Sequence, residues 1–356
     1  MMGQKYTRSP HDHCVYFKEL QGGNFIYLLL YVDDMLIACK SKVDVDNLKK
    51  QLAKEFEMKD LGEAKNILGM EIRRDKQASK VWLSQKAYLQ KVLQKFGIDG
   101  KSKAVSTPLG PQFQLSSKQC PQNDEDRHYM STVPYASAVG SLMYAMVCTR
   151  PDISQAVSMV SRYMHDPGRS HWHAVKWILR YLKGTSDVGL LFERQGTTDQ
   201  LCVGYVDSDY TGDLDKRRST TGYVFTIAGG PVSWRSTLQS TVALSTTESE
   251  YMAATEAMQE AIWMQGLLDD LGIEQKVLEV HCDSQSAIYW ATNPVHHART
   301  KHIDVRFHFI RDLIEKGDIL LKKIATKENP ADMLTKVVPA VKFNHCKDLI
   351  HITSVC

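Results

Sequence analysis

The longest apolar stretch of the chain, residues 25–39, is interrupted near its centre by two acids. β-Branched, aromatic and other apolar residues fill segments 25–31 and 35–39, and Val32, Asp33 and Asp34 lie between them. This pattern predicts two strands joined by a tight turn that carries both carboxylates at its tip. Two acids in the middle of the stretch also exclude a membrane-spanning helix at this place.

A lysine-rich helix is expected after two further short strands. Segments 63–72 and 80–83 predict the strands, Ser84 is a candidate helix cap, and apolar residues recur at helical spacing from 89 to 96. The helix and the residues after it carry one acid, Asp99, and five lysines: Lys86, Lys91, Lys95, Lys101 and Lys103. In isolation we favour a solvated helix face, and a surface that contacts phosphates is the alternative.

The middle of the chain predicts a linker followed by helices. Residues 107–134 are rich in Pro, Ser, Gln and Asp and show no period, which indicates a linker or long loop. Residues 135–183 are helical in character, with interruptions at Arg150-Pro151 and at 166–168. His171 and His173 are two residues apart and therefore lie on different helix faces, so we interpret them as packing or surface residues and not as metal ligands.

From residue 201 onward, strands and helices alternate. The pattern predicts strands at 201–206, 222–228 and 231–236, a helix at 245–271, a strand at 277–282, helices to 290 and at 299–316, a strand at 319–324 and a last helix at 329–338. Ser245 and Glu248 have capping-box spacing, so Ser245 is the expected cap of the long helix. Asp283 is the expected cap of the helix that ends at 290, and Asn329-Pro330 the expected start of the last helix. The order predicts a mixed α/β fold in which helices cover a sheet.

Four acids occupy places where such a fold builds its sites. Asp207 and Asp283 follow the first and fourth of these strands, and sites of open α/β sheets lie at such strand ends. Glu250 lies early in the long helix, whereas Glu248 lies about 200° away around it and is the less suitable partner. Asp332 lies in the first turn of the last helix, where the helix dipole favours a carboxylate.

The four acids support a metal site only as a group. Taken singly, each is more simply a cap, a turn residue or a surface acid. If they converge, they cannot all remain ionised without cations, because close carboxylates repel one another. Magnesium is the oxygen-preferring ion that suits such a site.

Charge and cysteine content narrow the class of protein. The net charge is +3, but residues from 201 onward hold 16 Lys and Arg against 20 Asp and Glu, and the residues before them hold 28 against 21. A phosphate-binding half beside a carboxylate-rich half is one interpretation of this asymmetry, and chance is the other. The eight scattered cysteines form no Cys-x-x-Cys pair, and the N-terminus has no apolar signal core. We therefore expect free thiols in a reducing intracellular compartment, the cytoplasm or the nucleus.

Ten segments, taken in order, resemble one known family. They are YVDDMLI at 31–37, LGMEI at 68–72, VGSLMY at 139–144, TRPDI at 149–153, LRYLKGT at 179–185, GYVDSD at 204–209, RSTTGY at 218–223, STTESEY at 245–251, CDS at 282–284 and ADMLTK at 331–336. Any one segment is weak, but the series is specific. The chain resembles the C-terminal part of the Pol polyprotein of copia-type LTR retrotransposons.

The resemblance implies a fold and a set of parts. It implies a ribonuclease H-like five-stranded mixed sheet with flanking helices, preceded by a partial reverse transcriptase palm and thumb and a helical connection. The parts expected are a partial palm at 1–83, a thumb-like helix and linker at 84–133, a connection at 134–200, a ribonuclease H domain at 201–338 and a C-terminal tail at 339–356.

The resemblance also implies functional residues. Asp207, Glu250, Asp283 and Asp332 match the four carboxylates of the ribonuclease H site, where two Mg²⁺ ions are expected and Mn²⁺ is an alternative. Asp33 and Asp34 match the paired metal-binding acids of the palm. The implied partners are an RNA–DNA hybrid and a template-primer, and no membrane. The candidates for gripping the phosphates of the hybrid are Lys216, Arg217, Arg218 and Lys301.

Two departures from the family pattern matter. A palm needs a third acid on a strand well before the Asp33-Asp34 turn, and about 30 residues precede that turn here. We therefore expect a fragment that does not polymerise DNA alone. Many ribonucleases H also carry a His shortly before the last acid, whereas residues 325–331 contain none. Rival interpretations are a reverse transcriptase module that needs a missing N-terminal part, and a non-enzymatic remnant.

Overall fold

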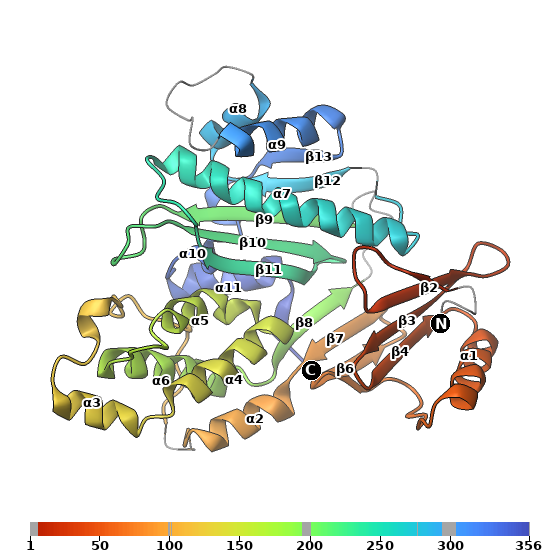
Figure 1. The fold of residues 1–356 in the computed structure, drawn as a ribbon, viewed down its shortest axis with the longest axis horizontal. Helices are drawn as coiled ribbons and strands as arrows, with labels where there is room; N and C mark the ends of the chain where they lie inside the picture. Colours follow the sequence, from red (N-terminus) through yellow and green to blue (C-terminus); the bar gives the residue numbers. More distant parts are fainter. Residues whose placement is uncertain are drawn as a thin grey trace.

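The computed structural model describes residues 6–98, 100, 102–193, 201–275, 277–293 and 304–355. These residues form three β-sheets and the helices around them (Figure 1). The fold is mixed α/β, as the sequence predicts. Among the described residues, no helix combines the length and the apolar character needed to cross a membrane.

The first sheet contains the predicted hairpin. Its strands are β1 (Thr7–Arg8), β2 (Val15–Glu19), β3 (Phe25–Tyr31) and β4 (Asp34–Cys39), in the order β1-β2-β3-β4. Tyr31 pairs with Asp34, and Val32 has a positive φ of 53°, which closes the tight turn at the tip. Helix α1 (Lys42–Glu55), which the sequence analysis did not anticipate, packs its buried Leu48 and Leu52 against this sheet.

The second sheet joins distant parts of the chain. Its strands lie in the order β14-β8-β7-β6-β5 and comprise β5 (Asn66–Ile67), β6 (Met70–Asp75), β7 (Lys80–Ser84), β8 (Val188–Glu193) and β14 (Ile352–Ser354). Two strands were predicted here, at 63–72 and 80–83. The second is β7, but the first contains β5 and the start of β6, because Leu68 and Gly69 have positive φ and form a turn between them. Strands β8 and β14 were not predicted. The segment 339–356, which we expected to be a tail, contains helix α11 (Ala340–Leu349) as well as β14. The proposed domain boundaries stay predictions.

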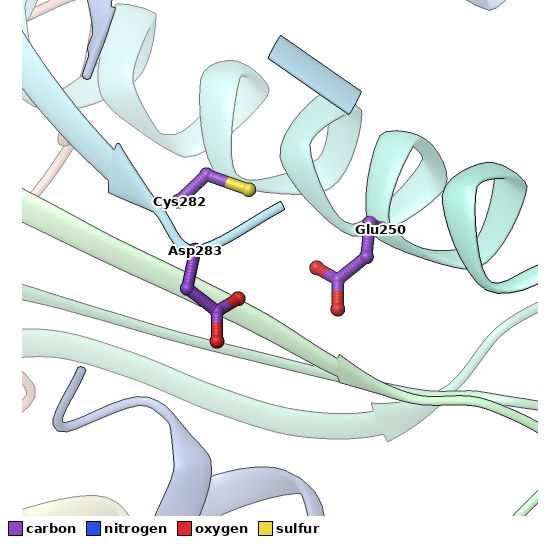
Figure 2. A group of neighbouring side chains, drawn as sticks. All are labelled: Glu250, Cys282 and Asp283. Atoms are coloured by element: carbon purple, nitrogen blue, oxygen red, sulfur yellow. The ribbon is translucent and has the colours of Figure 1, made fainter. Parts of the chain in front are cut away.

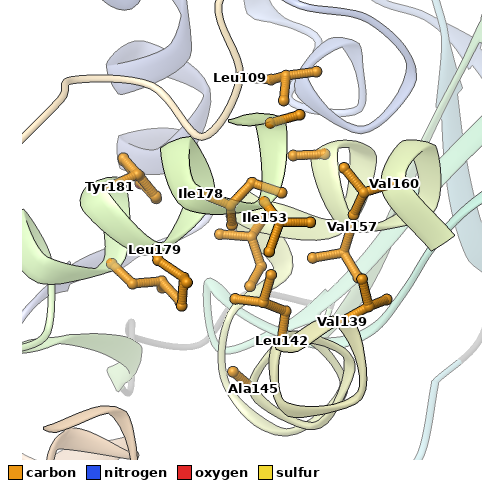
Figure 3. Packing of buried hydrophobic residues seen from close by; sticks show 14 of the residues in the cluster. Leu109, Val139, Leu142, Ala145, Ile153, Val157, Val160, Ile178, Leu179 and Tyr181 are labelled. Atoms are coloured by element: carbon orange, nitrogen blue, oxygen red, sulfur yellow. The ribbon is translucent and has the colours of Figure 1, made fainter. Parts of the chain in front are cut away.

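A helical region lies between these strands in the sequence. It contains α2 (Lys86–Lys95), η2 (Ser117–Gln119), α3 (Asp124–Ser131), α4 (Tyr135–Cys148), η3 (Pro151–Ile153), α5 (Ser154–Ser161) and α6 (Arg169–Gly184). Helix α2 buries Leu89, Val92 and Leu93 and exposes its three lysines. Figure 3 shows how apolar side chains of α4, η3, α5 and α6 meet in one core.

One predicted helix start was wrong, and one predicted loop contains a helix. The N-cap of α2 is Gln85 and makes no side-chain cap bond, whereas Ser84 belongs to β7. Residues 107–134 are not all loop, because Asn123 accepts a hydrogen bond from the Asp126 amide and starts α3. The Asn123 cap was a local signal for this helix, but the polar composition of residues 107–134 indicated a loop instead.

A buried ion pair lies in the core of the helical region. Arg150 and Asp152 are both fully buried and form a two-bond pair at 2.9 and 2.7 Å. Arg150 also donates to the Thr185 carbonyl, and the Tyr181 hydroxyl donates to Asp152 at 2.6 Å. Every charge in this group is compensated, which is the condition for tolerating it in a core.

The third sheet carries the acids of interest. Strands β9 (Cys202–Asp209), β10 (Thr220–Ile227) and β11 (Gly230–Leu238) are antiparallel, and β12 (Leu278–Cys282) and β13 (Ile319–Lys323) run parallel to β9. The order is β11-β10-β9-β12-β13, the mixed five-stranded sheet that was expected. The helices are α7 (Thr246–Asp270), α8 (Gln285–Thr292), α9 (Asp304–Lys316), the short η5 (Thr326–Glu328) and α10 (Asp332–Thr335).

The two faces of this sheet belong to two different hydrophobic cores. Tyr223 and Phe225 on β10 pack with residues of α7, whereas Val224 between them packs with Leu334 of α10 and with the helical region. This alternation is the period of a strand buried on both faces. Figure 1 shows α7 lying across one face of the sheet and α10 and α11 on the other side. The helical region therefore packs against the third sheet.

Candidate metal-dependent active site

The sheet register brings Asp207 and Asp283 side by side. Cys282 at the end of β12 aligns with Val206 of the parallel strand β9, so the next residues, Asp283 and Asp207, lie at the same rim. Two details were mispredicted. Strand β9 continues to Asp209, so Asp207 lies inside it, and the cap of α8 is Ser284 and not Asp283.

Hydrogen bonds of Asn329 position Asp332, the last of the four acids. The side-chain amide of Asn329 donates to the Val206 carbonyl at 2.9 Å, and its side-chain oxygen accepts from the Ala331 amide at 3.2 Å. These bonds bring Asp332, the first residue of α10, against β9. The predicted last helix was too long, because α10 spans only Asp332–Thr335.

Two hydrogen bonds fix the register of α7. Ser245 caps the helix by accepting from the Glu248 amide, as predicted, and the hydroxyls of Ser208 and Ser249 lie 2.9 Å apart. Glu250 therefore faces the rim of the sheet. Glu248 instead accepts from the Leu244 amide at 2.9 Å, which agrees with its exclusion from the site.

The four predicted acids converge. Carboxylate oxygens of Asp207, Asp283 and Asp332 lie within 4.8 Å of one another, and a second group joins Glu250, Asp283 and the Cys282 sulfur within the same limit. Figure 2 shows the carboxylates of Glu250 and Asp283 turned toward each other below α7. Asp283 belongs to both groups and therefore links them into one cluster.

Three polar residues that the sequence analysis missed complete this cluster. The Thr335 hydroxyl donates to Asp207. The Lys336 ammonium lies 3.3 Å from Asp207 and 2.9 Å from Asp332, and the Lys342 ammonium of α11 pairs with the other Asp332 oxygen. Lys336 follows Asp332 at helical i, i+4 spacing, which was a usable signal. Lys342 had no local signal, because its position depends on how α11 packs.

Burial and mutual repulsion perturb the acids. Asp207 is 1% exposed and Asp332 is fully buried. Burial, followed by the nearby charges of Asp207 and Asp283, raises the pKa of Glu250 to about 8. Burial also raises the pKa of Asp207, against the opposing effect of Lys336. Carboxylates with such pKa values in one place are typical of a functional site.

The residues present fit a hard divalent cation. Their donors are carboxylate oxygens, and Oε2 of Glu250 is buried without a hydrogen-bond partner. Such an oxygen needs a partner, and a Mg²⁺ or Mn²⁺ ion supplies one. Burial raises the pKa of the Cys282 thiol, and its sulfur accepts from the Ser284 amide at 3.4 Å, which favours a packing role for this residue.

The other predicted site residues lie elsewhere. Asp33 and Asp34 are exposed at the hairpin tip and, in the described part of the chain, join no group of three potential metal ligands. Lys216 and Arg217 are exposed and Arg218 is half-buried in the loop between β9 and β10. Lys301 lies outside the described residues.

The fold and the cluster define a ribonuclease H-like region attached to a reverse transcriptase-related part. Residues 1–111 match the family described as reverse transcriptase (RNA-dependent DNA polymerase). The chain is 54% identical over 354 residues to the retrovirus-related Pol polyprotein from transposon TNT 1-94 of Nicotiana tabacum, across 99% of this chain and 26% of that protein. It is 34% identical to a putative transposon Ty5-1 protein of Saccharomyces cerevisiae, across 72% of this chain and 80% of that protein.

The chain therefore belongs to the family of retrovirus-related Pol polyproteins of copia-type transposons. It spans about a quarter of the length of the plant polyproteins that it matches. Among solved structures, LC11-RNase H1, isolated from compost by a metagenomic approach, aligns with 39% of this chain and 94% of its own at 17% identity, with a TM-score of 0.30.

The raised pKa of Glu250 predicts a pH-dependent response to metal. The ordinary pKa of a glutamate is 4.5, and the pKa of Glu250 in the folded protein is about 8. The protonated form of Glu250 therefore contributes to the free energy of unfolding in full below about pH 4.5, and this contribution is lost as the pH rises through 8. Mg²⁺ binds the ionised form, so the increase in melting temperature on adding Mg²⁺ should grow toward and above pH 8. Thermal unfolding with and without Mg²⁺ across this range measures it, and Glu250→Gln should flatten the dependence. A wild-type response independent of pH would contradict the assignment.

Removing Lys342 should make the fold more dependent on metal. Lys342→Met leaves one oxygen of the fully buried Asp332 without its cation, which we expect to cost about 1–3 kcal/mol in the metal-free protein. Mg²⁺ should restore more stability in this variant than in the wild type. Urea unfolding with and without Mg²⁺ measures both effects, with the exposed Lys327→Met as the control. Equal stabilities of the variant and the wild type without Mg²⁺ would refute the ion pair.

Proposed function

We propose that the ribonuclease H-like region hydrolyses the RNA strand of RNA–DNA hybrids in a reaction that depends on divalent metal ions. The observation that carries this proposal is the convergence of Asp207, Glu250, Asp283 and Asp332 at one rim of the sheet. Two ions about 3.5–4 Å apart at such a site can activate a water and stabilise the leaving oxygen of a phosphodiester. We propose Mg²⁺ as the natural ion and Mn²⁺ as a substitute.

The residues of the chain would divide the work. Asp207, Glu250, Asp283 and Asp332 would hold the ions, and Thr335 and Lys336, which contact Asp207, would orient its carboxylate. The Lys336 side chain is 36% exposed, so its ammonium is accessible to a substrate phosphate. Contacts to 2′-hydroxyl groups would select the RNA strand. The free thiols among the described cysteines support our proposal of a reducing intracellular location, cytoplasmic or nuclear.

Cleavage of a labelled RNA–DNA hybrid tests the proposal directly. The wild type should cleave the RNA strand with Mg²⁺ and stop when a chelator is added. Asp207→Asn should lower the rate by about 10²-fold or more, because it removes one of the carboxylate charges that would hold the ions. Asp318→Asn makes the same chemical change at an exposed position before β13 and should keep the wild-type rate. Equal rates for Asp207→Asn and the wild type would remove Asp207 from the mechanism.

A second candidate function follows from the reverse transcriptase match over residues 1–111. Asp33 and Asp34 are exposed and, among the described residues, have no third acid beside them to complete a metal site. We therefore propose that this part acts in DNA synthesis only together with a further polymerase segment. Primer extension by the chain alone with Mg²⁺ should give no product. Extended primer in that assay would show that the described hairpin is sufficient.

A further inference from the structure

The loop between β9 and β10 leaves the sheet beside the carboxylate cluster. Asp209, two residues after Asp207, pairs with Thr220, so residues 210–219 form a loop at this rim. Lys216 and Arg217 in this loop are exposed. The loop also carries two acids, Asp213 and Asp215, whose negative charges would oppose the binding of phosphates if they faced the same way.

Asp213 is used to shape the loop. It is 4% exposed, its Oδ2 accepts from the Lys216 amide at 2.8 Å, and its carbonyl accepts from the Arg217 amide at 2.9 Å. Its Oδ1 pairs with a guanidinium nitrogen of Arg162, directly after α5, at 3.4 Å. The charge of Asp213 is therefore directed inward, toward the helical region.

Asp215 also joins the loop to the helical region. It accepts from the amide of Ser117 at 2.9 Å, from the hydroxyl of Ser117 at 2.7 Å and from the hydroxyl of Tyr163 at 3.1 Å. We call Asp213, Asp215 and their three partners, Arg162, Ser117 and Tyr163, the acid clamp. The clamp connects positions up to 98 residues apart in the sequence.

The donors of the clamp are themselves held in place. Tyr163 stacks on His171 with ring centroids 4.0 Å apart and planes 8° apart, and His171 is fully buried. His171 Nδ1 accepts from the Gly168 amide at 2.8 Å, which leaves the proton on Nε2, 3.2 Å from the Ser116 carbonyl. The same histidine therefore holds both Tyr163 and the residue before Ser117.

The clamp also places basic residues of two regions near one another. Ser117 and Asp215 are in contact, and each is followed directly by an exposed lysine, Lys118 and Lys216. Asp213 is buried, and Asp215, although exposed, is bound by Ser117 and Tyr163. Three exposed cations, Lys118, Lys216 and Arg217, therefore stand against one exposed acid in the two segments. A surface of this kind fits the phosphate backbone of a nucleic acid. Contacts to phosphates position a duplex on a protein without reading its sequence.

We propose that the acid clamp assembles Lys118, Lys216 and Arg217 into one phosphate-binding surface, so that the helical region helps to hold the RNA–DNA hybrid at the carboxylate cluster. Asp213 and Asp215 are positioning residues in this arrangement, since they act through the loop and not on the substrate. The inference rests on the proposed function.

Binding measurements on Asp215→Asn separate positioning from charge. Removing a negative charge beside phosphates should by itself tighten binding, whereas release of the clamp should weaken it. We expect severalfold weaker binding of a labelled RNA–DNA hybrid, measured by fluorescence anisotropy with chelator present so that no cleavage occurs. The slope of log affinity against log salt should fall in magnitude by about 0.9 for each phosphate that the variant no longer neutralises. Asp318→Asn, the matched change at an exposed site before β13, should not weaken binding.

A double-variant comparison shows where the effect arises. In a Lys216→Ala, Arg217→Ala background, Asp215→Asn should cause no further decrease in affinity, because the residues that it positions are gone. A further decrease of the same size, or tighter binding by Asp215→Asn alone, would overturn the proposal. If Asp215→Asn does not fold, Tyr163→Phe replaces it in the same assay, because this change removes one hydroxyl of the clamp. Unchanged binding by Tyr163→Phe would then overturn the proposal. A wild type that binds no hybrid would count against the proposed function itself.

Discussion

Repulsion among buried carboxylates is the constraint on which the surroundings of the site depend. Asp207 and Asp332 are almost completely removed from water, and Asp283 and Glu250 lie beside them. Such a group is stable only if protons, cations or ammonium groups compensate its charge. The chain supplies two ammonium groups, Lys336 and Lys342, for these four acids, and burial, followed by the charges of Asp207 and Asp283, still raises the pKa of Glu250. The shortfall in positive charge is what a divalent ion would supply.

Charge compensation at the site depends on residues outside the predicted ribonuclease H domain at 201–338. Lys342 reaches Asp332 from α11, and α11 packs through Phe343 and Cys346 into the core of the helical region. Strand β10 belongs to that core through Val224 and to the α7 core through Tyr223 and Phe225. The acid clamp makes a further connection at the β9–β10 loop. The helical region therefore supports the site through packing, charge and loop position together.

Local patterns in the sequence were sufficient for much of the fold and for the four acids. The hairpin around Asp33 and Asp34, the long helix with its Ser245 cap and the alternation of strands and helices after residue 201 follow from periodicity and capping chemistry, which involve near neighbours. Asp207, Glu250, Asp283 and Asp332 emerged from the joint pattern and the family resemblance, although each alone had a simpler explanation. Their catalytic and metal-binding roles stay predictions.

Only the tertiary structure decided the features that depend on distant partners. Strands β8 and β14 were not predicted, because each is short and is stabilised by pairing across the chain, as between Ile352 and Leu190. The same reason explains why Lys342 and the contact of Ser117 with Asp215 were missed. By itself, the sequence determined which residue types stand at which spacing, and hence the elements and the candidate acids. The packing of α11 and the register of β9 with β12 determined which charges meet, because contacts between remote segments leave no periodic trace in the chain.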